Sequence, residues 1–205
     1  GTARAYVAAC EYGEDKGIFG FGATGSIYGT TNLVSNSGVV ASDVSAVGTA
    51  RGKLAACEYG TDTAIFGFGE DASAFTGVTN LVSNVGVVAT DTTGVGTARI
   101  YIGGCGYGYD KGIFGFGYDG SYIGYTNLVS NAGVVATDVT AVGTARAYVA
   151  ACEYSGDKGI FGYGKNGGGG SELSITNLVS NAGVVATDTT GVGTAREGPG
   201  ACSFN

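Results

Sequence analysis

The sequence GTARAYVAACEYGEDKGIFGFG occupies residues 1–22, and TNLVSN follows at residues 31–36. Both strings recur along the chain at a nearly constant spacing. GTAR begins at Gly1, Gly48, Gly96, Gly143 and Gly193, and TNLVSN begins at Thr31, Thr79, Thr126 and Thr176. Self-similarity at a fixed period marks a repeat architecture in which each unit is one small structural motif. The spacing predicts four units, at 1–47, 48–95, 96–142 and 143–192, followed by a partial fifth unit at 193–205 that closes or caps the array.

Each unit contains short segments of alternating character that are typical of β-strands. In the first unit, Gly13–Lys16 supplies the residues of a tight turn. In GIFGFG, simple alternation places Phe19 and Phe21 on one face, and the glycines leave room for a ring of a neighbouring unit. No sustained period of 3.6 residues occurs, so we expect no helix. The strands expected in this unit are 5–12, 17–22, 31–36 and 38–42.

Four short strands in a repeat of this length are typical of one blade of a β-propeller. We therefore expect an all-β fold, a β-propeller of four four-stranded blades. A β-solenoid or an open stack of repeats is the alternative, although solenoid coils usually have shorter repeats.

The segments ARAYVAACEYGEDKGIFGFG and TNLVSNSGVVASD resemble kelch-type blades. In that family a first strand containing Arg leads through a turn to an aromatic-rich second strand that ends in a Gly pair. Here the ending is Gly20-Phe21-Gly22, and the later Trp of the family is missing. The near-identical units also resemble repeat tracts in virion and tail-associated proteins of environmental tailed phages. The resemblance implies kelch-like blades and a location on a virion appendage or in an extracellular fibre.

Composition excludes several classes of function. The chain of 205 residues has no His, so it has neither a Ser-His-Asp triad nor an imidazole metal ligand. Its net charge of −7 opposes a nucleic-acid partner. No apolar run is long enough for a membrane span. Gly20–Gly25 fits GxGxxG but follows a strand and opens a loop, so we expect no nucleotide or other cofactor. No signal peptide is visible, and because the chain begins with Gly we expect it to be processed or part of something longer.

Cysteine, aspartate and arginine also recur once or twice per unit. The equal spacing of the cysteines predicts buried, reduced thiols, with a ring of axial thiolates as the alternative. The aspartates and arginines predict turn stabilisation and Arg–Asp pairing between blades, with cation binding as the alternative. The residues concerned are Cys10, Cys57, Cys105, Cys152 and Cys202; Asp15, Asp62, Asp110 and Asp157; Asp43, Asp91, Asp138 and Asp188; and Arg4, Arg51, Arg99 and Arg146.

Function is expected where the units differ, in the loops at 23–30, 70–78, 118–125 and 165–175. Aromatic and acidic side chains there suit stacking on sugars and hydrogen bonding to their hydroxyls, while drift in exposed loops is the alternative. The candidate binding residues are Tyr28, Asp71, Phe75, Asp119, Tyr122 and Tyr125.

These patterns predict a non-enzymatic structural or adhesion protein with no catalytic residue and no metal site. Its expected partners are other copies of the chain or other structural subunits. A lectin-like module that binds cell-surface glycans is the alternative, and a propeller hydrolase or lyase is a third possibility that the few charged, repeat-bound residues disfavour.

Overall fold

The computed structural model describes residues 1–45, 47–140, 143–168 and 171–203. These residues form an all-β fold without helices, as the sequence predicts, and they include no helix able to cross a membrane. The strands are β1 (Ala8–Tyr12), β2 (Lys16–Gly20), β3 (Ala23–Thr24), β4 (Ser26–Ile27), β5 (Thr31–Val34), β6 (Ala55–Tyr59), β7 (Thr63–Gly67), β8 (Thr79–Val82), β9 (Gly103–Tyr107), β10 (Lys111–Tyr118), β11 (Tyr122–Val129), β12 (Ala150–Tyr154), β13 (Lys158–Lys165) and β14 (Glu172–Val179).

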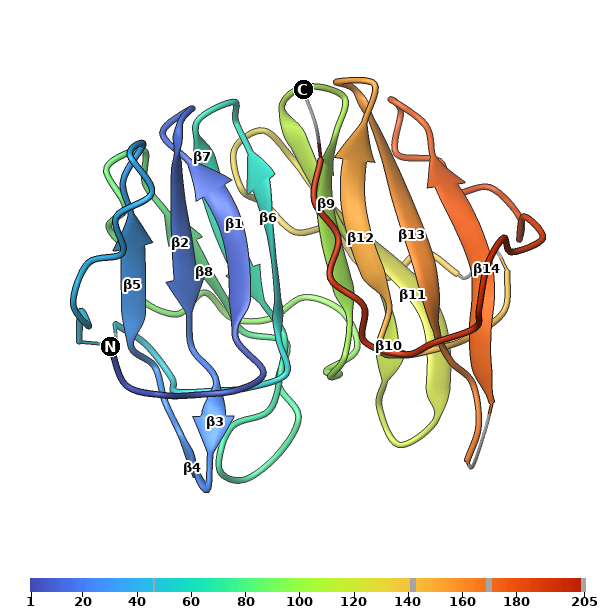
Figure 1. Cartoon of the computed structure of the whole chain (residues 1–205), viewed down its shortest axis with the longest axis horizontal. Coiled ribbons are helices and arrows are strands. Elements are labelled where there is room, and N and C mark those ends of the chain that lie inside the picture. Colours follow the sequence, from blue (N-terminus) through green and yellow to red (C-terminus); the bar gives the residue numbers. More distant parts are fainter. Residues whose placement is uncertain (46, 141–142, 169–170, 204–205) are drawn as a thin grey trace.

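Four three-stranded antiparallel sheets account for most of these strands (Figure 1). Sheet 1 has the order β1-β2-β5, sheet 2 β6-β7-β8, sheet 3 β9-β10-β11 and sheet 4 β12-β13-β14. Each sheet lies within one predicted unit, and β3 and β4 form a small additional hairpin in the first. Tight turns such as Gly13–Lys16 join the first two strands, which makes antiparallel pairing the natural outcome.

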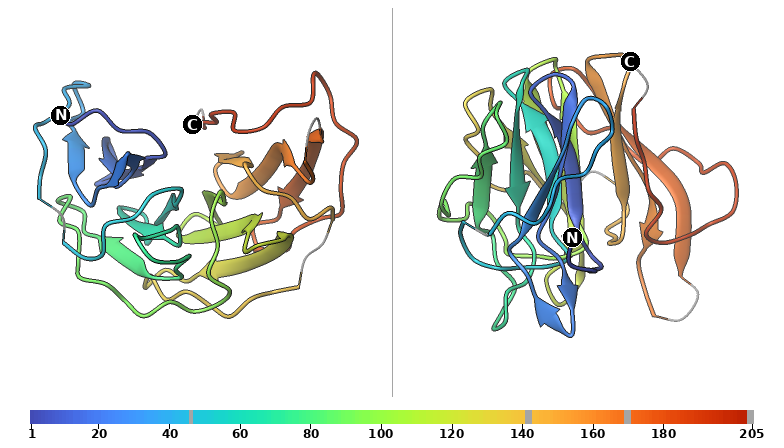
Figure 2. Two further views of the ribbon diagram at one scale, coloured as in Figure 1. Left: turned by 90° about the horizontal axis from the view of Figure 1, so that it is seen from below. Right: turned by 60° about the vertical axis from the view of Figure 1, so that its left-hand side comes forward.

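The four sheets follow one another around an arc, with their first strands on the concave side (Figure 2). Strand β1 packs beside β6, β6 beside β9, and β9 beside β12. In the described part of the chain the arc stays open between sheet 1 and sheet 4, so the sheets form no closed ring.

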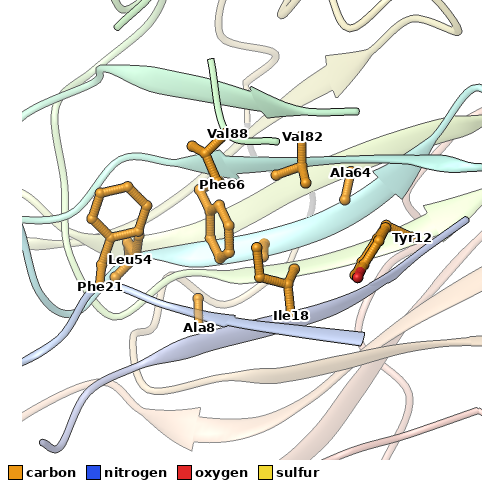
Figure 3. Packing of buried hydrophobic residues seen from close by; sticks show 10 residues of the cluster. Ala8, Tyr12, Ile18, Phe21, Leu54, Ala64, Phe66, Val82 and Val88 are labelled. Atoms are coloured by element: carbon orange, nitrogen blue, oxygen red, sulfur yellow. The ribbon is translucent and has the colours of Figure 1, made fainter. Parts of the chain in front are cut away.

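The hydrophobic core consists of layers between neighbouring sheets. Between sheets 1 and 2, Phe66 packs with Ile18 and Phe21, and the ring of Phe66 lies edge-on to that of Phe21 at 5.2 Å (Figure 3). A Cβ at Gly20 would lie 2.5 Å from Cζ of Phe66. The predicted role of glycine in GIFGFG, to make room for a ring of the next unit, is therefore confirmed.

The predicted alternation of the second strand is wrong at its end. Phe21 has a φ of 61° and Gly22 a φ of 116°, which turns Phe21 onto the side of Ile18 and away from Phe19. In sheets 3 and 4 the strand continues past the same irregularity, as a β-bulge at Phe116 and at Tyr163. The bulge gives each unit one aromatic ring on each face, so a sheet packs against both of its neighbours.

The predicted fourth strand at 38–42 is not a regular strand. This segment makes only an isolated bridge between Val40 and Val34, and the next lies between Val44 and Thr31. The side chain of Asn32 donates a hydrogen bond of 3.1 Å to the carbonyl of Ala41, so a side chain replaces part of the backbone ladder. The sheets are therefore three-stranded instead of four-stranded.

The first strand and the last segment also differ from expectation. The strand begins at Ala8 instead of residue 5, because Tyr6 has a φ of 55° that interrupts the extended chain. Residues 193–203, called the tail below, contain no strand and lie against sheet 4. Residues 204–205 of the predicted capping segment, 141–142 of the third unit and 169–170 of the fourth variable loop lie outside the described residues.

Candidate functional site

Each unit buries an arginine that is held by polar groups of its own unit. In the second unit, Nε of Arg51 donates a hydrogen bond of 2.9 Å to the carbonyl of Phe68, and Nη1 lies 3.9 Å from Asp91. Burial lowers the pKa of Arg51 to about 10, although Asp91 partly offsets this effect. The guanidinium carbon lies 4.3 Å from the centre of the Phe21 ring in the preceding sheet. The predicted Arg–Asp pairing between blades is therefore wrong: the ion pair lies within a unit, and the arginine reaches its neighbour through an aromatic ring.

The aspartates that follow the third strands have their carboxylates occupied. Asp91 accepts hydrogen bonds from Asn80 Nδ2 at 2.9 Å and from the Thr49 backbone at 2.9 Å. Burial raises the pKa of Asp91, but these hydrogen bonds outweigh it and leave the pKa below its usual value. The turn aspartates are held in the same way: Asp62 accepts a bond of 2.9 Å from Asn84. Asp62 thus holds a turn, as the sequence predicts, whereas Asp91 joins the start of its unit to the third strand.

The cysteines all have free thiols. Cys57 and Cys105 are buried, Cys10 and Cys152 are half-buried and Cys202 is exposed, so the prediction of burial is wrong for the last of them. Sγ of Cys57 would lie 2.6 Å from a Cβ at Gly112 of the next sheet. Burial, with the charges of neighbouring groups, raises the pKa of the Cys57 thiol. The thiols of Cys57 and Cys105 therefore behave as small packing groups between sheets. No group of acidic and cysteine side chains suited to a metal ion occurs among the described residues.

Three glutamates gather on the side of the molecule where the first strands of the sheets finish. They are the glutamates of β1, β6 and β12. Glu11, Glu58 and Glu153 line a cavity of about 280 Å³, together with Glu14 and Asp62 of the neighbouring turns. The third unit has Gly106 at the corresponding position, and a Cβ there would lie 2.8 Å from Oε2 of Glu153. Burial, together with the charges of Glu11 and Glu153, raises the pKa of Glu58 to about 7. The cluster is an acidic surface that gains a proton near neutral pH.

The variable loops lie on the opposite side of the molecule, where the first strands of the sheets begin. We call this side the loop end. Isolated bridges between Gly52 and Glu70 and between Ile100 and Tyr118 join these loops to the start of each unit. At this end Phe75 lies 6.3 Å from Tyr118, and Tyr118 lies 5.4 Å from Tyr122, measured between ring centres. The structure therefore brings together two of the predicted binding residues, Phe75 and Tyr122, through a tyrosine that was not predicted.

The other predicted binding residues are less available. Asp71 accepts hydrogen bonds of 2.7 and 2.9 Å from the backbone of Ser73 and Ala74, and Asp119 accepts one of 3.0 Å from Ser121. Both carboxylates are thus used by their own turns, although Asp71 also lines a groove of about 510 Å³ with Phe75. Tyr28 and Tyr125 are half-buried, and among the described residues no aromatic pair joins them to the cluster.

A row of larger side chains on the concave side of the loop end was missed by sequence reasoning. It consists of Tyr6, Lys53, Tyr101 and Tyr148, which occupy the second position after GTAR in successive units. The rings of Tyr101 and Tyr148 are stacked at 3.8 Å, and Tyr6 lies edge-on to Tyr101 at 6.2 Å. Nζ of Lys53 lies 5.2 Å from the centre of the Tyr101 ring and also pairs with Glu70. We call this set the tyrosine row.

The backbone explains why the tyrosine row is regular. All four residues have φ values between 55° and 57°, a left-handed conformation that is uncommon outside glycine. In this conformation the amide of Lys53 donates to the carbonyl of Tyr6, that of Tyr101 to Lys53, and that of Tyr148 to Tyr101. Aligning the units position by position would have revealed the row, because the second position after GTAR is Tyr in three units and Lys in the other.

Aromatic faces beside a lysine and carboxylates can stack on the apolar face of a sugar and hydrogen-bond its hydroxyl groups. The tyrosine row and the Phe75–Tyr118–Tyr122 cluster together make the loop end the best candidate for a binding surface. No family model matches the chain, and a search of the curated proteins finds no relative of it.

Proposed function

We propose that the chain is a non-enzymatic structural protein whose sheets are kelch-like blades of a β-propeller type, assembled as an open arc. One observation carries the proposal: the residues repeated in every unit contact a neighbouring unit or hold the turns of their own unit. Phe66 fills the space at Gly20, Arg51 covers Phe21, and the amide of Gly22 donates 2.9 Å to the carbonyl of Arg51. A chain that uses its repeated residues in this way is built to extend a scaffold.

The propeller interpretation is supported by the order of strands within each sheet. The first strand of every unit lies on the concave side, and each sheet packs face to face on the next. A location in a virion appendage or an extracellular fibre rests on the resemblance of the repeats alone. Self-association or incorporation among other structural subunits is the mode of action that we propose.

Electron microscopy of the purified full-length chain tests this proposal, since it separates discrete arcs from rings, filaments and larger particles. We expect assemblies that contain more than one copy. Single arcs at every concentration, together with failure to join any particle isolated with the chain, would argue against a structural role.

A lectin-like function is a second candidate because the loop end presents stacked aromatic rings. Tyr6 keeps 55% of its surface exposed, and Lys53 and Glu70 lie beside the row. Binding to a glycan array tests it, with the variant Tyr101→Gly as the discriminating case. Glycine already occupies this position at Gly198, where φ is 61°, so the substitution removes the ring without straining the backbone. Loss of glycan binding in this variant, with unchanged unfolding, would support the lectin function.

A further inference from the structure

The same contact joins each pair of neighbouring sheets. The second strand of the later sheet carries a phenylalanine that packs against a glycine of the earlier sheet. A Cβ at the glycine would lie 2.5 Å from Phe66 at Gly20, 2.9 Å from Phe114 at Gly67 and 2.7 Å from Phe161 at Gly115. The three phenylalanines have no exposed surface. The molecule therefore contains one type of interface, repeated three times, with a knob on one side and a socket on the other.

Within the described residues, sheet 1 has the knob without a socket to receive it. Phe19 is the counterpart of Phe66, yet 40% of its surface is exposed. Val7 and Val40 are 38% and 54% exposed, whereas their counterparts Leu54 and Val88, which pack in one cluster with Phe66, keep only 7% and 8%. An apolar face that is buried in every later unit thus lies open on the first, at one end of the arc (Figure 2).

Sheet 4 has the socket, and no described residue supplies a knob for it. A Cβ at Gly162 would meet only Cγ2 of Thr176, at 3.5 Å, and no aromatic ring. Beside it lies a cavity of about 220 Å³, lined by Ile160, Gly162 and Tyr163 together with part of the tail. Leu178 on the same face is 41% exposed. The cavity is therefore the place where the phenylalanine of a following unit would insert.

The tail already imitates the beginning of a following unit. Arg196 lies 4.0 Å above the ring of Tyr163, as Arg51 lies above Phe21. The amide of Gly164 donates 3.0 Å to the carbonyl of Arg196, and the amide of Gly198 donates 2.9 Å to Tyr148. The tail thus occupies the position of a first strand and leaves the position of the phenylalanine empty.

We propose that sheet 1 of a second copy docks on sheet 4, with Phe19 entering the socket at Gly162, and that the tail competes with this docking. The proposal rests on the proposed structural function and identifies the partner as the chain itself. A second copy fits because its exposed face is the counterpart of the faces that fill the three internal sockets. Docking in the internal geometry would bring Arg4 and Tyr6 to the places now held by Arg196 and Gly198, so the tail must leave. Because the two faces differ, the contact is heterologous and gives either a closed ring or a filament.

Sedimentation velocity of full-length variants over a range of concentrations tests the docking. Phe19→Asp should weaken association about thirtyfold, as loss of a central interface anchor does. Val39→Asp is the control, because Val39 is 64% exposed and its counterparts Val87, Val134 and Val184 remain 62–66% exposed in every unit. This control should associate like the unaltered chain.

Gly198→Pro tests the role of the tail without shortening the chain. Proline has no amide to donate to Tyr148 and does not adopt the φ of 61° found here, so the tail should detach. Association should then tighten by about tenfold or more, since the tail no longer covers the face of sheet 4 to which the second copy docks. Adding Phe19→Asp to Gly198→Pro should abolish the gain.

The outcomes separate this proposal from the broader one. Association that survives Phe19→Asp, or that Gly198→Pro leaves unchanged, would overturn the assigned faces while leaving a structural function in place. If Gly198→Pro remains a folded monomer, the docking proposal is wrong. The structural function itself is then decided by whether the chain joins particles with other subunits in the electron micrographs.

Discussion

The guanidinium of Arg51 lies 4.3 Å from the ring centre of Phe21, so a charged residue of one sheet covers an aromatic residue of the preceding one. Arg99 over Phe68 at 4.1 Å and Arg146 over Phe116 at 3.9 Å repeat this relationship. Among the described residues no ring of another sheet lies under Arg4, although it makes the same hydrogen bond to its own unit, from Nε to the carbonyl of Phe21. The chain thus supplies a natural reference for the energy of the cross-sheet contact.

We predict that Arg51→Lys destabilises the fold more than Arg4→Lys does. Both substitutions lose the planar fork of hydrogen-bond donors, but only the first also loses the stacking on a ring. The difference in the free energy of unfolding should be about 1–2 kcal/mol, the range for a desolvated cation–π contact. Urea unfolding of the two variants measures it. Equal losses would show that the arginine stabilises only its own unit.

Gly115→Ala should destabilise the protein by about 1–3 kcal/mol, the usual cost of adding a methyl group to a filled core. The methyl group would come within 2.7 Å of Cζ of Phe161. Gly162→Ala is the matched control, since the nearest atom there is 3.5 Å away, an ordinary contact. Thermal unfolding of both variants tests the point, and a control that is as costly as Gly115→Ala would contradict the picture of an empty socket.

The sequence predicts the units, the absence of helices and the packing role of glycine, because these depend on period, propensity and side-chain size. It does not predict the turn of the chain at Phe21, since a φ of 61° is uncommon outside glycine and neither the period nor the propensity of the strand indicates it. The fourth strand fails for a similar reason: the bond from Asn32 to the carbonyl of Ala41 is a tertiary contact that no strand propensity reveals.

The candidate binding residues, too, are only partly predictable from the sequence. Aromatic residues in variable loops are visible in the sequence, and Phe75 and Tyr122 do gather around Tyr118. Whether a carboxylate is free to bind a ligand depends on the conformation of its own turn. The carboxylate of Asp71 already accepts hydrogen bonds from the backbone of Ser73 and Ala74. The tyrosine row joins residues about one unit apart, so only the three-dimensional stacking of units brings Tyr101 onto Tyr148.

Thiol reactivity should follow burial. Cys202 is exposed and should react first with a thiol reagent, whereas Cys57 and Cys105 are buried with raised pKa values and should react only on unfolding. Mass spectrometry of the native protein during timed alkylation measures the order. Five thiols should be counted after unfolding without a reductant. Fewer than three would mean that disulfides form in solution and that the packing role of the inner cysteines is incorrect.

Glu58 should make the protein less stable as the pH rises toward neutrality. Its pKa is raised from 4.5 to about 7 by burial and by the charges of Glu11 and Glu153. Between these two values the folded protein binds a proton that the unfolded chain releases, so the free energy of unfolding falls with increasing pH. The stabilising contribution is complete below pH 4.5 and is lost as the pH rises through about 7, a loss on the order of 3 kcal/mol.

Asp15, in the first turn, acts in the opposite direction at lower pH. Hydrogen bonds, from Lys16 first and Asn36 next, lower the pKa of Asp15 below 3.8, so its contribution is present above that value and is lost on further acidification. Stability should therefore be greatest at about pH 4–5. Urea unfolding of the unaltered chain and of Glu58→Gln, from acid to neutral pH, measures the free energy of unfolding on both sides of this maximum.

Glu58→Gln should remove most of the decline in the free energy of unfolding between pH 4.5 and 7, because glutamine fills the same space without a charge. The loss of stability below about pH 4 should stay unchanged. Glu14→Gln is the control: Glu14 is exposed and lines the same cavity, but the charges that raise the pKa of Glu58 are those of Glu11 and Glu153, so this variant should keep the decline. If Glu58→Gln retains the full decline, the loss of stability belongs to another group, and the glutamate cluster would not be the proton-binding surface inferred from the positions of Glu11, Glu58 and Glu153.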